Sequence, residues 1–463
     1  MSLRWSEALI MDAPADTGNG RVKAAAVAPR PSQPSVMAFA AWHSLFWLVF
    51  ANAVGVLLAT LLLFPSLNHV LGEWTYGRWM PVHINLQLYG WCSIPLVAFL
   101  FKVYGADRKP ASHWCRSTLW IWSSALGVGT LSWLNGHSSG KLFLDWTGYS
   151  RILFPLALTI LWCLLAFSFA KGRNNGVPSS FKANATKITG LILLLAVPVL
   201  IYIAASPDLY PPVNPDSGGP TGASQLESSL VIVAVLLLLP FGLTHLKTQR
   251  PWPVPIAWIT LGIEVLLCLG LGRTDVSHHR PIQYISLGSL LVWIPLTPAY
   301  FGAFEWNSNT QRWRTAFICW WAVLVPTGWF LFLPGVLDHF KFTDGLVGHS
   351  LLAMAGFVSS LLIFVMVQLL AEDGWILNGA WSFWAWHGSV LAYVLLMFVA
   401  GWREGLDPAF TVIPGRARTT IYASRLLLGA LMLIASGDWL RKASGLFRET
   451  GASHISDPLE QMR

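Results

Sequence analysis

The sequence predicts an all-α, polytopic membrane protein whose bundle has twelve transmembrane helices. Hydrophobic residues make up 54% of the 463 residues, charged residues make up only 11%, and 26 residues are Trp. Such a composition is typical of multi-pass membrane proteins and not of soluble domains of this length. Windows of roughly 20 apolar residues, each enough to cross a ~30 Å hydrocarbon core, recur along the chain. They predict spans at 36–64, 80–102, 114–134, 150–170, 187–205, 229–246, 254–272, 283–304, 314–334, 345–371, 380–401 and 418–440.

The distribution of positive charge predicts the orientation of these spans. Lys and Arg are frequent in alternate connections, such as 102–116, 171–187 and 441–448, and sparse in the connections between them. Cytoplasmic loops of membrane proteins carry this excess, so both termini are expected inside. The net charge of +8 therefore reflects topology in a lipid bilayer, and no nucleic-acid partner is expected.

The segments outside the spans predict no further catalytic domain. Residues 1–35 are polar and rich in Ala and Pro, which predicts a cytoplasmic tail and not a signal peptide. The spans make up a transmembrane domain at 36–440, and 441–463 form a second cytoplasmic tail. The acidic, Pro/Gly-rich outer segment 206–228 is expected to be a surface lid or docking loop. No internal repeat or nucleotide-binding loop is evident.

The five cysteines include no C-x-x-C pair. Covalently attached haem, an iron–sulfur cluster and a disulfide framework are therefore not expected in this chain.

Several ionisable side chains lie in or beside the predicted spans. His83 is just inside the second span and His349 about one turn inside the tenth, while His278 and His279 lie together at the outer end of the seventh. Four imidazoles at one depth are the nitrogen ligands that haem iron and copper use. Scattered interfacial histidines are an equal alternative.

Three more ionisable residues differ in position. Glu264 is near the middle of the seventh span, where a carboxyl is costly unless it is protonated or paired, so a proton relay and a structural hydrogen bond are both open. His387 is in the inner half of the eleventh span and is expected to pack among tryptophans. Arg403 is at the outer end of that span, where it can meet anionic groups.

Four strings occur in one order along the chain: YGRWMPVHINLQLYGW, SHHRPIQYISLGSLLVWIP, FTDGLVGHSLLAMAGF and FWAWHGSVLAYVLLMFVAGWREGLDPAF. Together with the twelve spans they resemble the catalytic subunit I of the haem–copper oxidase superfamily, most of all the C-family (cbb-type) cytochrome c oxidases and nitric oxide reductases. The resemblance implies that His83 is a ligand of the low-spin haem and His349 the proximal ligand of the high-spin haem. It implies that His278 and His279 are two of three copper ligands and that Arg403 lies near the haem propionates.

The chain departs from the family pattern at three places. Leu351 stands where the second low-spin haem ligand is expected, and leucine cannot bind iron. The third copper histidine is absent, with Gln225 or a neighbour in its place, and an amide is a poor copper ligand. The active-site tyrosine falls in the string WPVPIAW, which has no Tyr.

The resemblance and these departures together predict a degenerate subunit-I homologue. It would be an integral subunit of a respiratory redox complex in the bacterial inner membrane, binding haem b but not copper. Its partners would be other membrane subunits, among them a c-type cytochrome. Two alternatives stay open: a haem-free structural or assembly subunit, and an oxidase or NO reductase with a modified centre.

Overall fold

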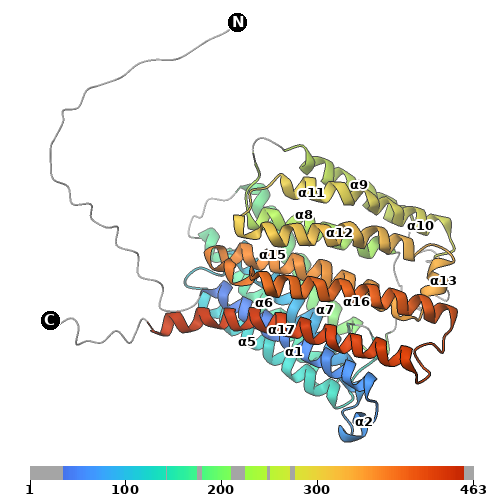
Figure 1. The fold of residues 1–463 in the computed structure, drawn as a ribbon. Helices are drawn as coiled ribbons and strands as arrows, with labels where there is room; N and C mark the ends of the chain where they lie inside the picture. Colours follow the sequence, from blue (N-terminus) through green and yellow to red (C-terminus); the bar gives the residue numbers. More distant parts are fainter. Residues whose placement is uncertain are drawn as a thin grey trace, which may run out of the picture.

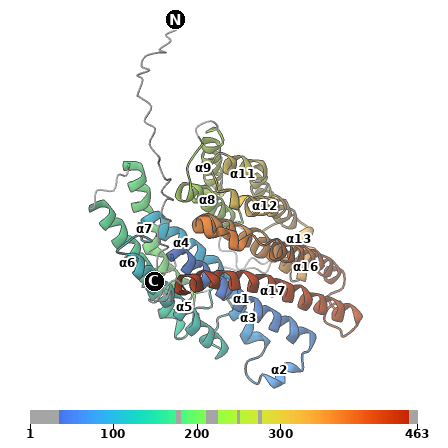
Figure 2. The same cartoon turned by 60° about the vertical axis from the view of Figure 1, so that its left-hand side comes forward.

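The chain folds into a bundle of long helices that run side by side (Figures 1 and 2). The computed structural model describes residues 35–452 except 142, 175–179, 210–224, 248–250 and 272–276. Among these residues every regular element is helical, and one isolated β-bridge joins Leu246 to Phe304. The predicted all-α class is confirmed. The tail 1–34 and most of the loop 206–228 lie outside the described residues.

The helices follow one another with short connections. In chain order they are α1 (Val36–Leu63), α2 (Leu67–Val70), α3 (Tyr76–Asn85), η1 (Leu86–Cys92), α4 (Ser93–Tyr104), α5 (Ser112–Leu134), α6 (Ser150–Asn174), α7 (Phe181–Ala204), α8 (Gln225–Leu243), α9 (Pro253–Leu271), α10 (Pro281–Gly288), η2 (Ser289–Val292), α11 (Trp293–Gly302), η3 (Ser308–Thr310), α12 (Gln311–Leu331), α13 (Val336–Phe340), α14 (Asp344–Leu351), η4 (Leu352–Val358), α15 (Ser359–Leu370), η5 (Ala371–Leu377), α16 (Ala380–Leu406) and α17 (Arg416–Ala452).

Eleven of these helical segments are long and apolar enough to cross a membrane, as expected of a multi-pass membrane protein. Each coincides with a span predicted from the sequence. The remaining predicted span, 114–134, is helix α5, which has 23 residues but is not among the eleven. A crossing by α5 therefore stays a prediction. Helix α17 continues to Ala452, beyond the end predicted for the last span.

Local sequence signals explain where several helices begin and end. The hydroxyls of Ser35 and Ser180 accept hydrogen bonds from backbone N–H groups in the first turns of α1 and α7. Helix α10 begins with Pro281, whose missing N–H would have no partner in the first turn. Helix α4 ends at Gly105, which has a φ of 70°. This left-handed conformation favours glycine.

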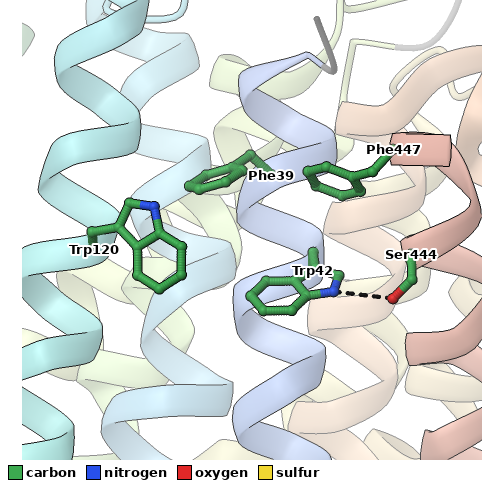
Figure 3. Close-up of a pocket in the computed structure, with 5 residues that line it drawn as sticks. All are labelled: Phe39, Trp42, Trp120, Ser444 and Phe447. Carbon is green, nitrogen blue, oxygen red and sulfur yellow. Dashed lines mark hydrogen bonds between the residues drawn. The ribbon is translucent and has the colours of Figure 1, made fainter. Parts of the chain in front are cut away.

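The first and last helices lie against each other (Figure 1). The rings of Phe39 and Phe447 are 6.1 Å apart, so the start of α1 lies beside the far end of α17. The described chain thus begins and ends at the same end of the bundle. Phe39, Phe447, Trp42, Trp120 and Ser444 line a small pocket of about 310 Å³ there (Figure 3).

Candidate haem and metal sites

Two predicted haem histidines each precede an unusual helical segment. The π-helical segment η1 begins three residues after His83, and the π-helical segment η4 begins three residues after His349. Both segments have 7 residues, and each is followed by an α-helix of 12 residues, α4 or α15. π-Helical turns are rare and occur frequently at functional sites. The structure therefore singles out two of the three spans that the histidine pattern indicates.

The two spans share a local repeat, His-x6-Gly-x2-Ser. It places Gly90 and Ser93 after His83, and Gly356 and Ser359 after His349. Each serine hydroxyl donates to the carbonyl oxygen five residues earlier, Ser93 to Leu88 at 2.9 Å and Ser359 to Met354 at 2.8 Å. The equivalence was missed in the sequence because so few positions match.

Each shared glycine admits a tryptophan from a neighbouring helix. A Cβ on Gly90 would lie 2.5 Å from the Cβ of Trp47 in α1, and a Cβ on Gly356 would lie 2.8 Å from Cδ2 of Trp320 in α12. The spans are also joined directly, because the indole of Trp91 in η1 donates to the Ser359 hydroxyl at 2.9 Å. The two spans are thus in direct contact beside their π-helical segments.

His83 has the arrangement that an iron ligand needs. Its Nδ1 lies 2.8 Å from the carbonyl oxygen of Ala51 in α1, so the ring donates there and Nε2 keeps its lone pair. Metal-binding histidines are usually oriented by such a hydrogen bond on the other nitrogen. Gly55 allows the close approach, since a Cβ there would lie 2.8 Å from Cε1 of His83.

His349 is held less firmly. Its Nδ1 is buried and has no hydrogen-bond partner among the residues that the structure describes. Its ring packs against Gly328 of α12, where a Cβ would lie 3.3 Å from Cε1. Both imidazoles are nitrogen donors of the kind that haem iron uses, and Nδ1 is anchored in His83 but has no partner within the described residues in His349. From the sequence, His349 is the first choice of haem ligand and His83 the second, and the hydrogen bond to Ala51 favours the reverse order.

The two histidines predicted to bind copper have a third potential metal ligand beside them, which the sequence did not reveal. His278, His279 and Asp338 of α13 have ligand atoms within 4.8 Å of one another. His278 is fully buried, and its Nε2 lies 3.1 Å from Oδ1 of Asp338, while Nε2 of the half-exposed His279 lies 3.5 Å from Oδ2. Asp338 is far from the pair in sequence, so no local spacing could have linked them.

Asp338 is already engaged in an ion-pair network. Lys341 donates to Oδ1 at 3.2 Å, and the backbone N–H of Gly335 donates to Oδ2 at 3.0 Å. Burial alone would raise the pKa of Asp338, but the hydrogen bonds from Gly335, His278 and Lys341 outweigh it and lower the pKa to about 2. A divalent cation would compete with Lys341 for the carboxylate. The donor set of two imidazoles and one carboxylate suits zinc better than copper.

Of the remaining predicted site residues, Arg403 is exposed in the last turn of α16. An arginine that is largely shielded from solvent at this end of the bundle is instead Arg425 of α17, whose side chain is 14% exposed. It pairs with Asp344 at 3.2 Å and donates to the Tyr393 hydroxyl at 3.2 Å. Asp344 is the first residue of α14, so this ion pair fixes the helix that carries His349.

Glu264 and His387 both make structural hydrogen bonds. Glu264 is 3% exposed, and its Oε2 accepts from the indole of Trp293 at 2.7 Å. Its role as a proton relay stays a prediction. His387 packs among aromatic rings, as expected, with Phe383 at 4.3 Å between ring centroids. The side chain of Gln225, the expected substitute for a copper ligand, lies outside the described residues.

Comparison with known proteins adds no relative: no protein-family model matches the chain, and no curated protein matches its sequence. The site must therefore be judged from its own geometry.

Proposed function

We propose that this protein is a membrane-integral, b-type haem-binding subunit of a respiratory redox complex, similar to subunit I of cbb-type oxidases. Haem would be held by His83 or by His349, and haem iron would supply reversible one-electron transfer when it is bound. A c-type cytochrome subunit is the proposed electron donor, and the bacterial inner membrane the proposed location. The whole four-electron reduction of oxygen is not proposed for this chain, because Leu351 removes one haem ligand and the copper ligand set is incomplete.

The observation that carries this proposal is the pairing of each histidine with a π-helical segment. An ionisable residue inside a membrane helix is costly, and a π-helical turn gives up regular backbone geometry. Two spans that share both features, at the same spacing, are hard to explain by helix packing alone. A binding function for the two histidines explains both features together.

The residues around the two histidines would hold their imidazole rings in place for a bound haem. The Ala51 carbonyl holds the ring of His83, and Gly55 leaves room for that ring beside α1. The Arg425–Asp344 pair holds the start of α14 and thereby the position of His349. Hydrogen bonds and ion pairs of this kind fix a ligand without touching the iron.

The test is the visible absorption spectrum of the purified protein, reduced and oxidised, with haem quantified as its pyridine complex. We expect a b-type spectrum in the wild type. We expect His83→Ala to lose most of the bound haem, and His349→Ala to lose haem or shift the Soret band. His43→Phe is the matched control, because His43 is also a buried span histidine with one ring nitrogen hydrogen-bonded, to Ser123 at 2.8 Å, but no π-helical segment follows it in α1.

A wild-type protein without a Soret band would refute this proposal and favour the haem-free structural subunit. Haem retained in full by both histidine variants would refute the assigned ligands. Turnover of O2 or NO by the purified protein would favour the third reading, a modified oxidase centre.

A further inference from the structure

A second pocket, of about 730 Å³, lies at the end of the bundle where α12 and α16 begin. Its walls come from η3, α12, the residue after η5 and α16, and include Arg312, Cys319, Trp320, Asn378, Trp384 and His387. The volume is in the range of small-molecule sites, roughly 300–1,000 Å³. The charge distribution predicts that this end faces the cytoplasm.

The pocket contains a buried hydrogen-bond donor that lacks a partner. His387 is 8% exposed, and the indole N–H of Trp320 donates to its Nδ1 at 3.0 Å. An indole nitrogen can only donate, so Nδ1 accepts and the neutral ring carries its proton on Nε2. That Nε2 has no partner in the part of the chain that the structure describes. A buried N–H left unpaired is costly, which indicates a missing acceptor.

The pocket also contains a buried acceptor. The amide NH2 of Asn378 donates to the Asn309 carbonyl at 2.8 Å, which identifies Oδ1 as the free atom. This Oδ1 is buried and unpaired within the described residues. Arg312 does not satisfy it, because that guanidinium donates to the backbone carbonyl of Asn378 at 2.5 Å.

The remaining walls are aromatic and reach the surface of the bundle. Trp320 and Phe383 line the pocket, and Trp384 is 69% exposed beside them. Only 22% of the apolar window of Ser308–Leu331 is fully buried, so part of this span faces outward, toward the predicted lipid. A ligand could therefore enter from the membrane.

We propose that this pocket binds the ring of a membrane-soluble quinone or quinol. A planar ring with oxygen substituents offers an acceptor to the Nε2–H of His387 and, in the quinol form, a hydroxyl donor to Oδ1 of Asn378. An anionic headgroup fits less well, because the Asn378 lone pairs would face its negative charge. The site would give the chain a lipid-soluble redox partner, and it does not depend on the proposed haem site.

The pocket between α1, α5 and α17 (Figure 3) differs from the proposed quinone pocket. Its buried side has paired polar groups, since Trp42 donates to Ser444 at 3.0 Å and Ser444 donates to the Leu440 carbonyl at 2.9 Å, while Trp120 is exposed. An apolar pocket with satisfied polar groups selects no particular ligand. It carries no proposal.

The first test is equilibrium binding of decylubiquinone to the detergent-purified protein. We expect saturable binding by the wild type. His387→Phe should bind at least about fivefold more weakly, because it loses one buried hydrogen bond. His387→Gln should partly restore binding. The control His43→Phe, at a buried histidine outside the pocket, should bind as the wild type does.

The second test uses two free cysteines of the wild-type chain, so it needs no variant. Cys319 lines the pocket and is exposed, and Cys163 is exposed on the distant helix α6. Decylubiquinone should slow the reaction of Cys319 with N-ethylmaleimide, measured by peptide mass spectrometry, and leave Cys163 unchanged. The proposal would be overturned if the wild type bound no decylubiquinone, or if His387→Phe bound it equally well. It would also be overturned if decylubiquinone did not selectively protect Cys319, or if phosphatidylglycerol occupied the pocket instead of the quinone. None of these readouts uses haem.

Discussion

At the scale of single residues, the structure adds partners that sequence order conceals. His83, His278, His279 and His349 are evident as ionisable residues at the ends of apolar spans. Their hydrogen-bond partners are not, because Ala51 acts through its backbone carbonyl and Asp338 lies in a separate short helix. Sequence patterns therefore predicted the imidazoles but could not predict which were anchored.

The Asp338 network gives a prediction about stability. Asp338→Asn removes the negative charge that faces His278 and Lys341, so we expect it to destabilise the protein at pH 7. The loss should be only about 1–2 kcal/mol, because solvent screens the partly exposed carboxylate. Asp107→Asn is the control, because Asp107 forms only a looser pair, at 3.7 Å, with an exposed Lys102. It should cost less than about 1 kcal/mol. Thermal unfolding in detergent measures both.

The same network predicts a pH dependence. The folded-state pKa of Asp338, about 2, is below its ordinary value of 3.8, so its ionisation favours folding. This stabilisation is fully present above about pH 4 and is lost as the pH falls toward 2. The difference in unfolding temperature between wild type and Asp338→Asn should therefore shrink over that interval. A difference that stays constant down to pH 2 would contradict the assigned cause.

At the scale of helices, the sequence predicted the spans well and their internal geometry poorly. Long apolar windows are decided by many residues together, so eleven predicted spans coincide with suitable helices. A π-helical segment depends instead on a few contacts between distant helices, such as Trp91 to Ser359 and Trp320 against Gly356. No local pattern contains that information.

The shared glycines provide the test of these segments. In Gly356→Ala the added Cβ would meet Trp320 at 2.8 Å, so the indole or η4 must shift, and we expect destabilisation of about 1–3 kcal/mol. Gly127→Ala in α5 is the control, since nothing lies within 4 Å of a Cβ there. The control should be neutral or slightly stabilising, as expected for alanine in a helix. Thermal unfolding temperatures compare the two variants. Equal behaviour of both would show that the close approach of Trp320 is not required.

At the scale of the whole molecule, the geometry bears on the number of membrane crossings. The start of α1 lies beside the end of α17, and a chain that begins and ends on one side crosses the membrane an even number of times. Eleven helices meet the criteria of length and composition, which is an odd number. Helix α5 has the required length, because 23 residues at about 1.5 Å each span about 34 Å. It also packs against α1, α3 and α6 and exposes Trp120 and Leu131 on its outer surface.

We therefore expect α5 to be the twelfth crossing, which places the connections on its two sides on opposite faces of the membrane. Arg108 precedes α5, Ser138 follows it, and both are exposed. In a background without Cys163 and Cys319, Ser138→Cys should react with a membrane-impermeant maleimide in intact spheroplasts. Arg108→Cys should react only after the membrane is permeabilised. If both cysteines react from the same side, α5 does not cross and the twelve-helix topology is wrong. Every later histidine would then lie on the opposite side of the membrane from the one assigned.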